Sequence, residues 1–146
     1  MHATAKITLF FCAGAIYVNA HIKKISELDG LGPKLPLIFI AFFLASLSII
    51  GIPPMGGSWS KFLLMAGSVD AGMPLMLAVL AISSLLNVYY LLEPCARAFF
   101  KPAIKKVHVE NYILTIIPPV VTAMISLSLF FTIDWVRPLT TLMVMP

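Results

Sequence analysis

The sequence predicts an all-α integral membrane protein with about four transmembrane helices, the second of which is broken between Gly51 and Gly57. Hydrophobic residues make up 60% of the 146-residue chain and charged residues only 11%, and the mean hydropathy is +1.01. A soluble domain carries about 25% charged residues, so this composition is typical of a membrane protein. One span needs about 20 apolar residues. The chain therefore has room for roughly four crossings of the lipid bilayer, and we treat residues 1–146 as a single membrane domain.

The remaining composition argues against several other classes of protein. The net charge of +4 comes from loop lysines, and no basic stripe interleaved with aromatic residues indicates a nucleic-acid partner. Cys12 and Cys95 lie inside apolar segments without the spacing of a disulfide framework or a metal site, so we expect them to pack as weakly polar residues. The sequence contains no nucleophile–base constellation or nucleotide-binding loop. We expect no cofactor and no catalysis by this chain alone, and any redox chemistry would belong to partner subunits.

The first predicted crossing covers residues 1–20, and its uncharged part is short. Residues 7–20 would form about 21 Å of helix, whereas the hydrocarbon core is about 30 Å thick, so Lys6 and His2 must be drawn into the membrane for this segment to cross. A second interpretation stays open. The basic start, the apolar core and the Val18-Asn19-Ala20 ending are also typical of a cleavable signal peptide.

The second predicted crossing, residues 35–69, contains the break. Pro53 and Pro54 remove two backbone donors, and Gly51, Gly56 and Gly57 permit non-helical backbone. Broken backbone at membrane depth is tolerated only where protein buries it or where it lines a wet cavity. Ser58 is predicted to cap the second half-helix, which would place Lys61 in its first turn. Lys61 is then either a functional cation at a half-helix end or a lysine that extends from an ordinary loop into the headgroups.

The third and fourth crossings complete the predicted bundle. The third covers residues 73–92 and continues through Glu93 and Arg97, which are four residues apart and are expected to form an ion pair at the membrane interface. The fourth covers residues 111–133 and is expected to bend at its two central prolines. The tail carries Trp135 and Arg137 as an expected interface anchor.

The distribution of basic residues predicts the orientation. If residues 35–69 are one crossing, the two basic loops, around residues 21–34 and 97–110, fall on the same side of the membrane. The positive-inside rule then places both loops in the cytoplasm and both termini outside.

Several motifs, in this order, resemble the proton-conducting, antiporter-like membrane subunits of respiratory complex I, of multisubunit (Mrp-type) cation/proton antiporters and of membrane-bound hydrogenases. The matching segments are His2-x-x-x-Lys6-x-x-Leu9-Phe10-Phe11-Cys12-Ala13-Gly14-Ala15-Ile16, Ile25-Ser26-Glu27-Leu28-Asp29-Gly30-Leu31-Gly32, Gly51-Ile52-Pro53-Pro54 with Gly57 and Ser60-Lys61, Ser83-Ser84-Leu85-Leu86-Asn87, and Arg97-Ala98-Phe99-Phe100. The resemblance covers residues 1 to about 100. It implies that the chain corresponds to the C-terminal four helices of such a subunit, because the family's earlier helices, with their own broken helix and Glu/Lys pair, have no counterpart here.

The resemblance also implies a site. The positions matched by Lys6 and Lys61 belong, in the family, to a chain of protonatable residues along the membrane midplane. Burial in a low-dielectric medium disfavours a charged lysine, which makes proton exchange accessible to it. His2 lies four residues before Lys6, hence on the same helical face, and is the third candidate for proton transfer. Five polar residues are instead assigned to helix packing and the membrane interface: Ser60, Ser83, Ser84, Tyr89 and Tyr90.

We therefore expect proton translocation, with or without exchange of Na⁺, as part of a multisubunit complex in a prokaryotic inner membrane. Its partners would be the other membrane subunits of a respiratory, antiporter or hydrogenase complex. Two alternatives remain. In the first, the chain is a non-conducting structural subunit, or a truncated fragment, that packs in such a complex. In the second, it is a membrane protein with a cleaved signal peptide and no transport role.

Overall fold

The structure is a computed structural model that describes residues 2–103, 109–110 and 112–132. Within these residues the chain is helical and contains no strand. Its elements, in chain order, are α1 (His2–Ala20), the 3₁₀ turn η1 (Ile25–Glu27), α2 (Pro36–Ile50), α3 (Gly56–Asp70), α4 (Pro74–Phe100) and α5 (Ile113–Phe131). The loop residues Lys105, Lys106 and His108 and the tail residues Trp135 and Arg137 lie outside the described residues, so their predicted roles stay predictions.

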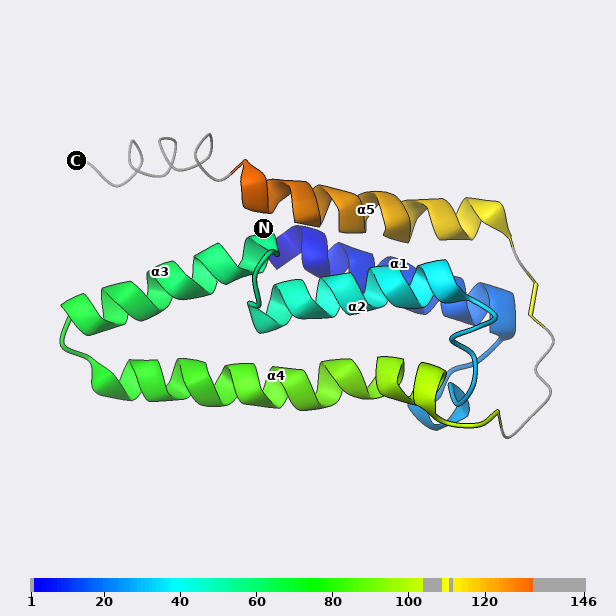
Figure 1. The fold of residues 1–146 in the computed structure, drawn as a ribbon, viewed down its shortest axis with the longest axis horizontal. Coiled ribbons are helices and arrows are strands. Elements are labelled where there is room, and N and C mark those ends of the chain that lie inside the picture. The colour runs from blue at the N-terminus through cyan, green and yellow to red at the C-terminus, as the bar shows by residue number, and fades with distance from the viewer. Residues whose placement is uncertain (1, 104–108, 111, 133–146) are drawn as a thin grey trace.

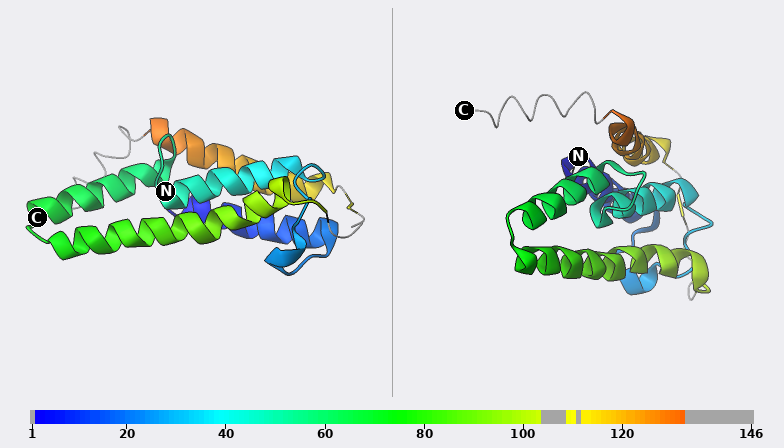
Figure 2. Two further views of the ribbon diagram at one scale, coloured as in Figure 1. Left: turned by 60° about the horizontal axis from the view of Figure 1, so that its bottom comes forward. Right: turned by 60° about the vertical axis from the view of Figure 1, so that its left-hand side comes forward.

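The helices form an antiparallel bundle with four passes along its long axis (Figure 1). The helices α1, α4 and α5 are each long and apolar enough to cross a membrane, whereas α2 is a shorter apolar helix. The views in Figures 1 and 2 agree that α2 and α3 follow one another in the same direction, and that α4 runs back alongside both. The all-α membrane fold with a broken second pass is therefore confirmed.

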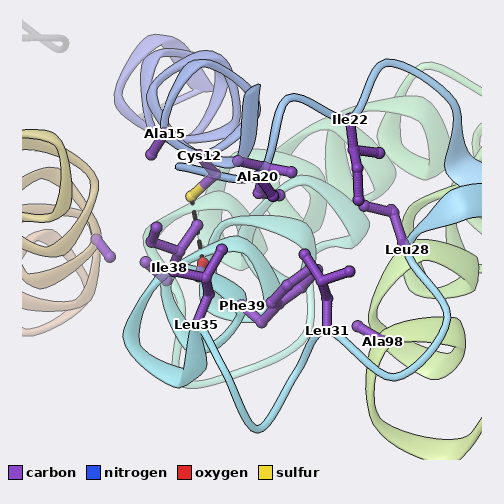
Figure 3. Close-up of a cluster of buried hydrophobic side chains, with 13 residues drawn as sticks. Cys12, Ala15, Ala20, Ile22, Leu28, Leu31, Leu35, Ile38, Phe39 and Ala98 are labelled. Atoms are coloured by element: carbon purple, nitrogen blue, oxygen red, sulfur yellow. Dashed lines mark hydrogen bonds between the residues drawn. The ribbon is translucent and has the colours of Figure 1, made fainter. Parts of the chain in front are cut away.

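The central helix of the bundle is α2, which packs against the other four. Its buried side chains include Ile38 and Phe39, both without solvent exposure. These two residues join Cys12 of α1, Leu28 and Leu31 of the following loop, and Ala98 of α4 in one apolar cluster (Figure 3). The thiol of Cys12 donates to the carbonyl oxygen of Ile38 at 3.5 Å, which agrees with the predicted role of this cysteine as a packing residue.

The loop between η1 and α2 docks onto the end of α4. The N–H of Gly32 donates to the carbonyl oxygen of Ala98 at 2.9 Å, and a Cβ on Gly32 would lie 2.6 Å from the Phe99 ring. A Cβ on Gly30 would lie 2.6 Å from Ala103, and Gly30 also has a φ of +75°. Both glycines are therefore required by the close approach of the two segments. This docking fixes the end of the bundle at which α1 and α4 end and α2 and α5 begin. We call it the loop end of the bundle.

Asn19 holds the start of α5 against the end of α1. Its side-chain nitrogen donates to the carbonyl oxygen of Ala15 and to Thr115 Oγ1, both at 2.7 Å, and its side-chain oxygen accepts the N–H of Tyr112 at 2.8 Å. Asn19 is 1% exposed, so these bonds satisfy an amide that would otherwise be costly to bury. The result is that α1 is packed into the membrane bundle against both α2 and α5.

Candidate functional site

The break in the second pass begins at the end of α2. Gly51 caps this helix in the left-handed region, with φ of +90°, and its N–H donates to the carbonyl oxygen of Leu47 at 2.9 Å. A Cβ at Gly51 would lie 2.7 Å from Cδ of Lys61. Glycine is needed here for two reasons, since it accepts the positive φ and leaves room for the stem of the lysine.

The start of α3 is set by the close packing of its first turn on α2. A Cβ on Gly57 would lie 1.8 Å from the carbonyl oxygen of Ser48, so no larger residue fits. The hydroxyl of Ser48 accepts the N–H of Gly57 at 3.3 Å and a bond from Ser126 of α5 at 3.2 Å. Three helices are thus joined at the break by small residues and hydroxyl groups, as in other membrane helix interfaces.

The predicted capping by Ser58 is wrong. The helix α3 begins at Gly56, three residues before the first helical position that a Ser58 cap would give, and it has no side-chain cap. The Ser58 hydroxyl instead donates back to the carbonyl oxygen of Met55 at 2.7 Å. Lys61 consequently lies in the second turn of α3 rather than the first, further from the helix N-terminus and its positive dipole end.

Lys61 reaches back across the break and is held by two uncharged acceptors. Its Nζ donates to the carbonyl oxygen of Ile50 at 2.8 Å and to Ser84 Oγ at 2.7 Å. Ile50 is the last residue of α2, whose final carbonyls have no partner within the helix. Among the described residues, Lys61 forms no ion pair with a carboxylate. Ser84, which the sequence predicts to be a helix-packing residue, therefore contacts Lys61 directly, and no local signal predicts this contact.

The lysine lies deep along the bundle. Ser84 is about 15 Å along α4 from Pro74, at 1.5 Å per residue, and α4 continues well beyond it. The break lies between the two ends of α4 rather than at either of them (Figure 1). Lys61 is therefore far from both ends of this membrane-spanning helix, where a lysine would otherwise extend to the headgroups.

One cavity contains all three residues predicted for proton transfer. It has a volume of about 670 Å³ and is lined by His2 and Lys6 of α1 and by Lys61 of α3. The wall from α4 adds Ser83, Asn87 and Tyr90, and a hydrogen bond joins the last two. Ser83 and Tyr90 had been assigned to packing and the interface, and the position of Asn87 at the site was not foreseen. Ser83, Asn87 and Tyr90 reach the cavity together because residues 83, 87 and 90 share one face of α4.

Lys61 also lines a second, more apolar cavity. It has a volume of about 700 Å³ and is lined by the break, by α3 to α5, and by the aromatic residues Trp59, Phe62 and Phe130. The Trp59 ring stacks at a tilt on Phe130, with 5.9 Å between centroids. Lys61 thus lines both cavities, and we call the one that it shares with His2, Lys6 and Asn87 the polar cavity, because more of its lining side chains are polar.

Glu93 and Arg97 lie at the loop end of α4. The distance from Arg97 Nε to Glu93 Oε1 is 2.9 Å, and Arg97 Nη1 lies 3.3 Å from Oδ1 of Asp29 in the docked loop. The Asp29 side chain is only 6% exposed. The contact with Asp29 was not predicted, because it joins residues 68 positions apart. Among the described residues, no group of His, Cys, Asp and Glu side chains is arranged to hold a metal ion.

These features are those of a known class of membrane protein. Residues 1–87 match the family model described as NADH:quinone oxidoreductase/Mrp antiporter, transmembrane, and the chain belongs to this family. It is 39% identical over 100 residues to NADH-quinone oxidoreductase subunit N of Desulforudis audaxviator, an alignment that covers 68% of this chain and 20% of that protein. It is 27% identical over 110 residues to F(420)H(2) dehydrogenase subunit N of Methanosarcina mazei, covering 69% of this chain and 22% of that protein.

The fold agrees with a solved structure of the same kind. Superposition on a chain of respiratory complex I from Thermus thermophilus with bound aureothin gives a TM-score of 0.69 at 25% identity. The match covers 92% of this chain and 33% of that one. The chain therefore spans about a fifth of the length of its sequence relatives and a third of the matched structure. It is an integral membrane protein with the fold of an antiporter-like subunit.

Proposed function

We propose that this chain is the C-terminal, four-helix part of a proton-translocating subunit and works with other membrane subunits in a multisubunit complex. The observation that carries this proposal is the single cavity lined by His2, Lys6 and Lys61. Ionisable residues inside a membrane are costly and are typical of ion pathways and proton relays. Here three of them, from two helices, share one cavity next to a broken helix.

In this proposal Lys61 is the group that gains and loses the proton. When charged, its ammonium is stabilised by the carbonyl oxygen of Ile50 and the hydroxyl of Ser84. Neither acceptor carries a full charge, so the lysine is not locked into its charged form as it would be by a carboxylate. Lys6 and His2 exchange protons with Lys61 through water in the polar cavity, and transport of Na⁺ in exchange is compatible with the same site.

The test is proton translocation by the assembled complex that carries Lys61→Met. Methionine keeps much of the length and apolar bulk of lysine but has no titratable group. We expect translocation to fall about 100-fold, within the range for loss of a positioned proton-transfer group, while the amount of complex stays unchanged. Lys101→Met, at an exposed lysine outside the cavity, is the matched control and should translocate normally.

Two results would contradict the proposal. Normal translocation in Lys61→Met would make Lys61 a structural or anchoring residue. Normal assembly with no proton translocation by the unsubstituted complex would favour the non-conducting structural subunit.

We also propose the orientation, with the loop end of the bundle in the cytoplasm and the turn at Gly72 outside; the N-terminal His2, which lines the cavity of Lys61, lies inside the bundle rather than outside as the sequence predicts. The described basic residues Lys23, Lys24, Lys34 and Lys101 all belong to segments at that end, which supports this orientation by the positive-inside rule. Single cysteines at Glu27 and Lys101 should be labelled from the cytoplasmic side, and one at Gly72 from outside. Labelling of positions 27 and 72 from the same side would contradict the proposed orientation.

A further inference from the structure

A third cavity lies at the loop end of the bundle, away from Lys61. It has a volume of about 600 Å³, within the range of roughly 300–1,000 Å³ that is usual for small-molecule pockets. Its walls are mainly apolar and come from α1, the loop after it, α2 and α4; they include Ile16, Leu28, Phe39 and Pro94. The cavity is an apolar groove that begins at the end of one membrane-spanning helix.

The mouth of this groove carries two adjacent cations. Lys23 and Lys24 both line the cavity, and both are exposed. The Nζ of Lys23 lies 5.4 Å from the ring centroid of Tyr17, a distance typical of a cation–π contact. Neither lysine forms an ion pair with a carboxylate among the described residues, in contrast to Arg97, which contacts two. The groove therefore combines an apolar interior with positive charge that its own walls do not neutralise.

We infer that this groove is a binding site for an anionic phospholipid, with the phosphate at Lys23 and Lys24 and an acyl chain along the apolar wall from Ile16 to Phe42. The groove starts at the loop end of α1, where headgroups meet the protein, and Tyr17 is an aromatic residue of the kind that lies at this interface. Basic pockets at helix ends are suited to acidic headgroups, and an apolar groove beneath them is suited to an acyl chain. A carboxylate-bearing helix of a partner would also neutralise the lysines, but a single phospholipid supplies both an acidic headgroup for them and an acyl chain for the apolar lining beneath.

A lipid bound in this groove would also affect the neighbouring polar cavity. Ala13 and Phe42 line both this groove and the polar cavity that contains Lys6 and Lys61. An acyl chain against these two residues would lie next to the polar cavity and would keep bulk water from entering it on that side. The lipid site itself does not depend on the function proposed for Lys61.

The site can be tested on the full 146-residue chain by native mass spectrometry with lipids of identical acyl chains. We expect phosphatidylglycerol to bind roughly 30-fold more tightly than phosphatidylcholine, because each lysine near an anionic surface contributes about a factor of five. Lys23→Gln/Lys24→Gln should remove this preference, whereas Lys101→Gln, at the same end of the bundle, should keep it. Glycerophosphoglycerol and inorganic phosphate, which lack acyl chains, should not displace the lipid at equal concentration.

Several results would overturn the inference. Equal binding of the two lipids, or an unchanged preference in the double variant, would remove the role of the lysines. Displacement by inorganic phosphate would reduce the site to a simple anion site. A photo-crosslinker at Ile25, which lines the groove, should capture lipid in native membranes, and capture of a protein subunit there would identify a partner helix as the occupant instead.

Discussion

Lys61 and Arg97 are two cations of the same membrane bundle that are held in opposite ways. Arg97, at the loop end of α4, contacts the carboxylates of Asp29 and Glu93 at 3.3 and 2.9 Å. Lys61, at the broken helix, contacts a carbonyl oxygen and a hydroxyl at 2.8 and 2.7 Å. Both side chains are well hydrogen-bonded, but only the arginine is neutralised by negative charge within the described part of the chain.

This difference separates a structural cation from one suited to changing its charge. An arginine stays protonated in proteins, and a partner carboxylate keeps such a pair fixed. Arg97 therefore joins the loop after η1 to α4 and fixes the end of the bundle. A lysine with neutral acceptors can lose its proton without leaving a carboxylate unpaired, and this one lies in a cavity with two further basic residues, His2 and Lys6. The proposed transport function depends on this contrast.

The largest expected effect comes from exchanging lysine and arginine at the two positions. Lys61→Arg keeps the positive charge but cannot release its proton usefully, so translocation should fall about 100-fold with the complex still assembled. Arg97→Lys keeps a positive charge near Asp29 and Glu93 but loses the planar guanidinium group, whose separate nitrogens contact the two carboxylates. The amount of complex should therefore fall, while translocation per complex stays normal. Proton uptake by reconstituted vesicles, normalised to the amount of complex, measures both. Full activity in Lys61→Arg would remove the distinction between the two sites.

The next effect is on folding and assembly. Arg97→Met leaves the nearly buried Asp29 carboxylate without its partner, which is strongly destabilising. We expect several-fold less chain in the membrane fraction, measured by quantitative immunoblotting. Adding Asp29→Asn removes the unpaired charge and should restore part of that amount. No loss in Arg97→Met would show that the ion pairs at this end contribute little to the fold.

A smaller effect is expected at Lys6, which lines the same cavity as Lys61 but on α1. Lys6→Ala should leave assembly intact and slow translocation by roughly tenfold, less than the effect of about 100-fold or more that is typical of a positioned proton-transfer group, because His2 and water can still carry protons. Lys6→Arg should be about as slow, since its proton is not released. If Lys6→Arg were fully active, Lys6 would be an anchor of α1 and not a proton carrier.

The smallest effect is expected from Ser84→Ala, which removes one of the two acceptors of Lys61. Loss of one such hydrogen bond is worth about 1 kcal/mol, so translocation should change by about fivefold. Ser128→Ala, whose hydroxyl donates to the carbonyl oxygen of Ile125 within α5, is the matched control and should have no effect. The pH dependence of translocation should change in the first variant and not in the second.

The sequence predicted those parts of the structure that depend on local composition. The crossings follow from apolar runs, and the break follows from Gly51, Pro53 and Pro54, since these residues free or constrain the backbone wherever the chain goes. Gly56 and Gly57, predicted as part of the break, are instead the first two residues of α3. It also predicted that His2 and Lys6 share a face, because that depends only on helical spacing. Lys61 joins His2 and Lys6 in one cavity only through the fold, and the part of these residues in proton transfer is a proposal.

Contacts between distant segments were not predicted. The contact of Arg97 with Asp29 and that of Lys61 with Ser84 join residues 68 and 23 positions apart, and neither pairing has a local signal. The prediction that Ser58 caps α3 was wrong. A serine that follows two glycines is typical of an N-cap, but the packing of Gly57 on Ser48 places the start of the helix earlier, at Gly56. The glycine positions were recognised, but the reason for Gly57 and Gly32 is a neighbouring helix that only the fold supplies.

The most direct test of the central idea asks whether Lys61 must release a proton. In a background with Cys12 and Cys95 replaced by alanine, Lys61→Cys can be alkylated with bromoethylamine, which restores a titratable amine in nearly the same place. Alkylation with bromoethyltrimethylammonium instead installs a permanent charge. We predict that proton translocation by the assembled complex is restored by the amine and not by the permanent cation. Equal restoration by both would contradict a proton-carrying role for Lys61.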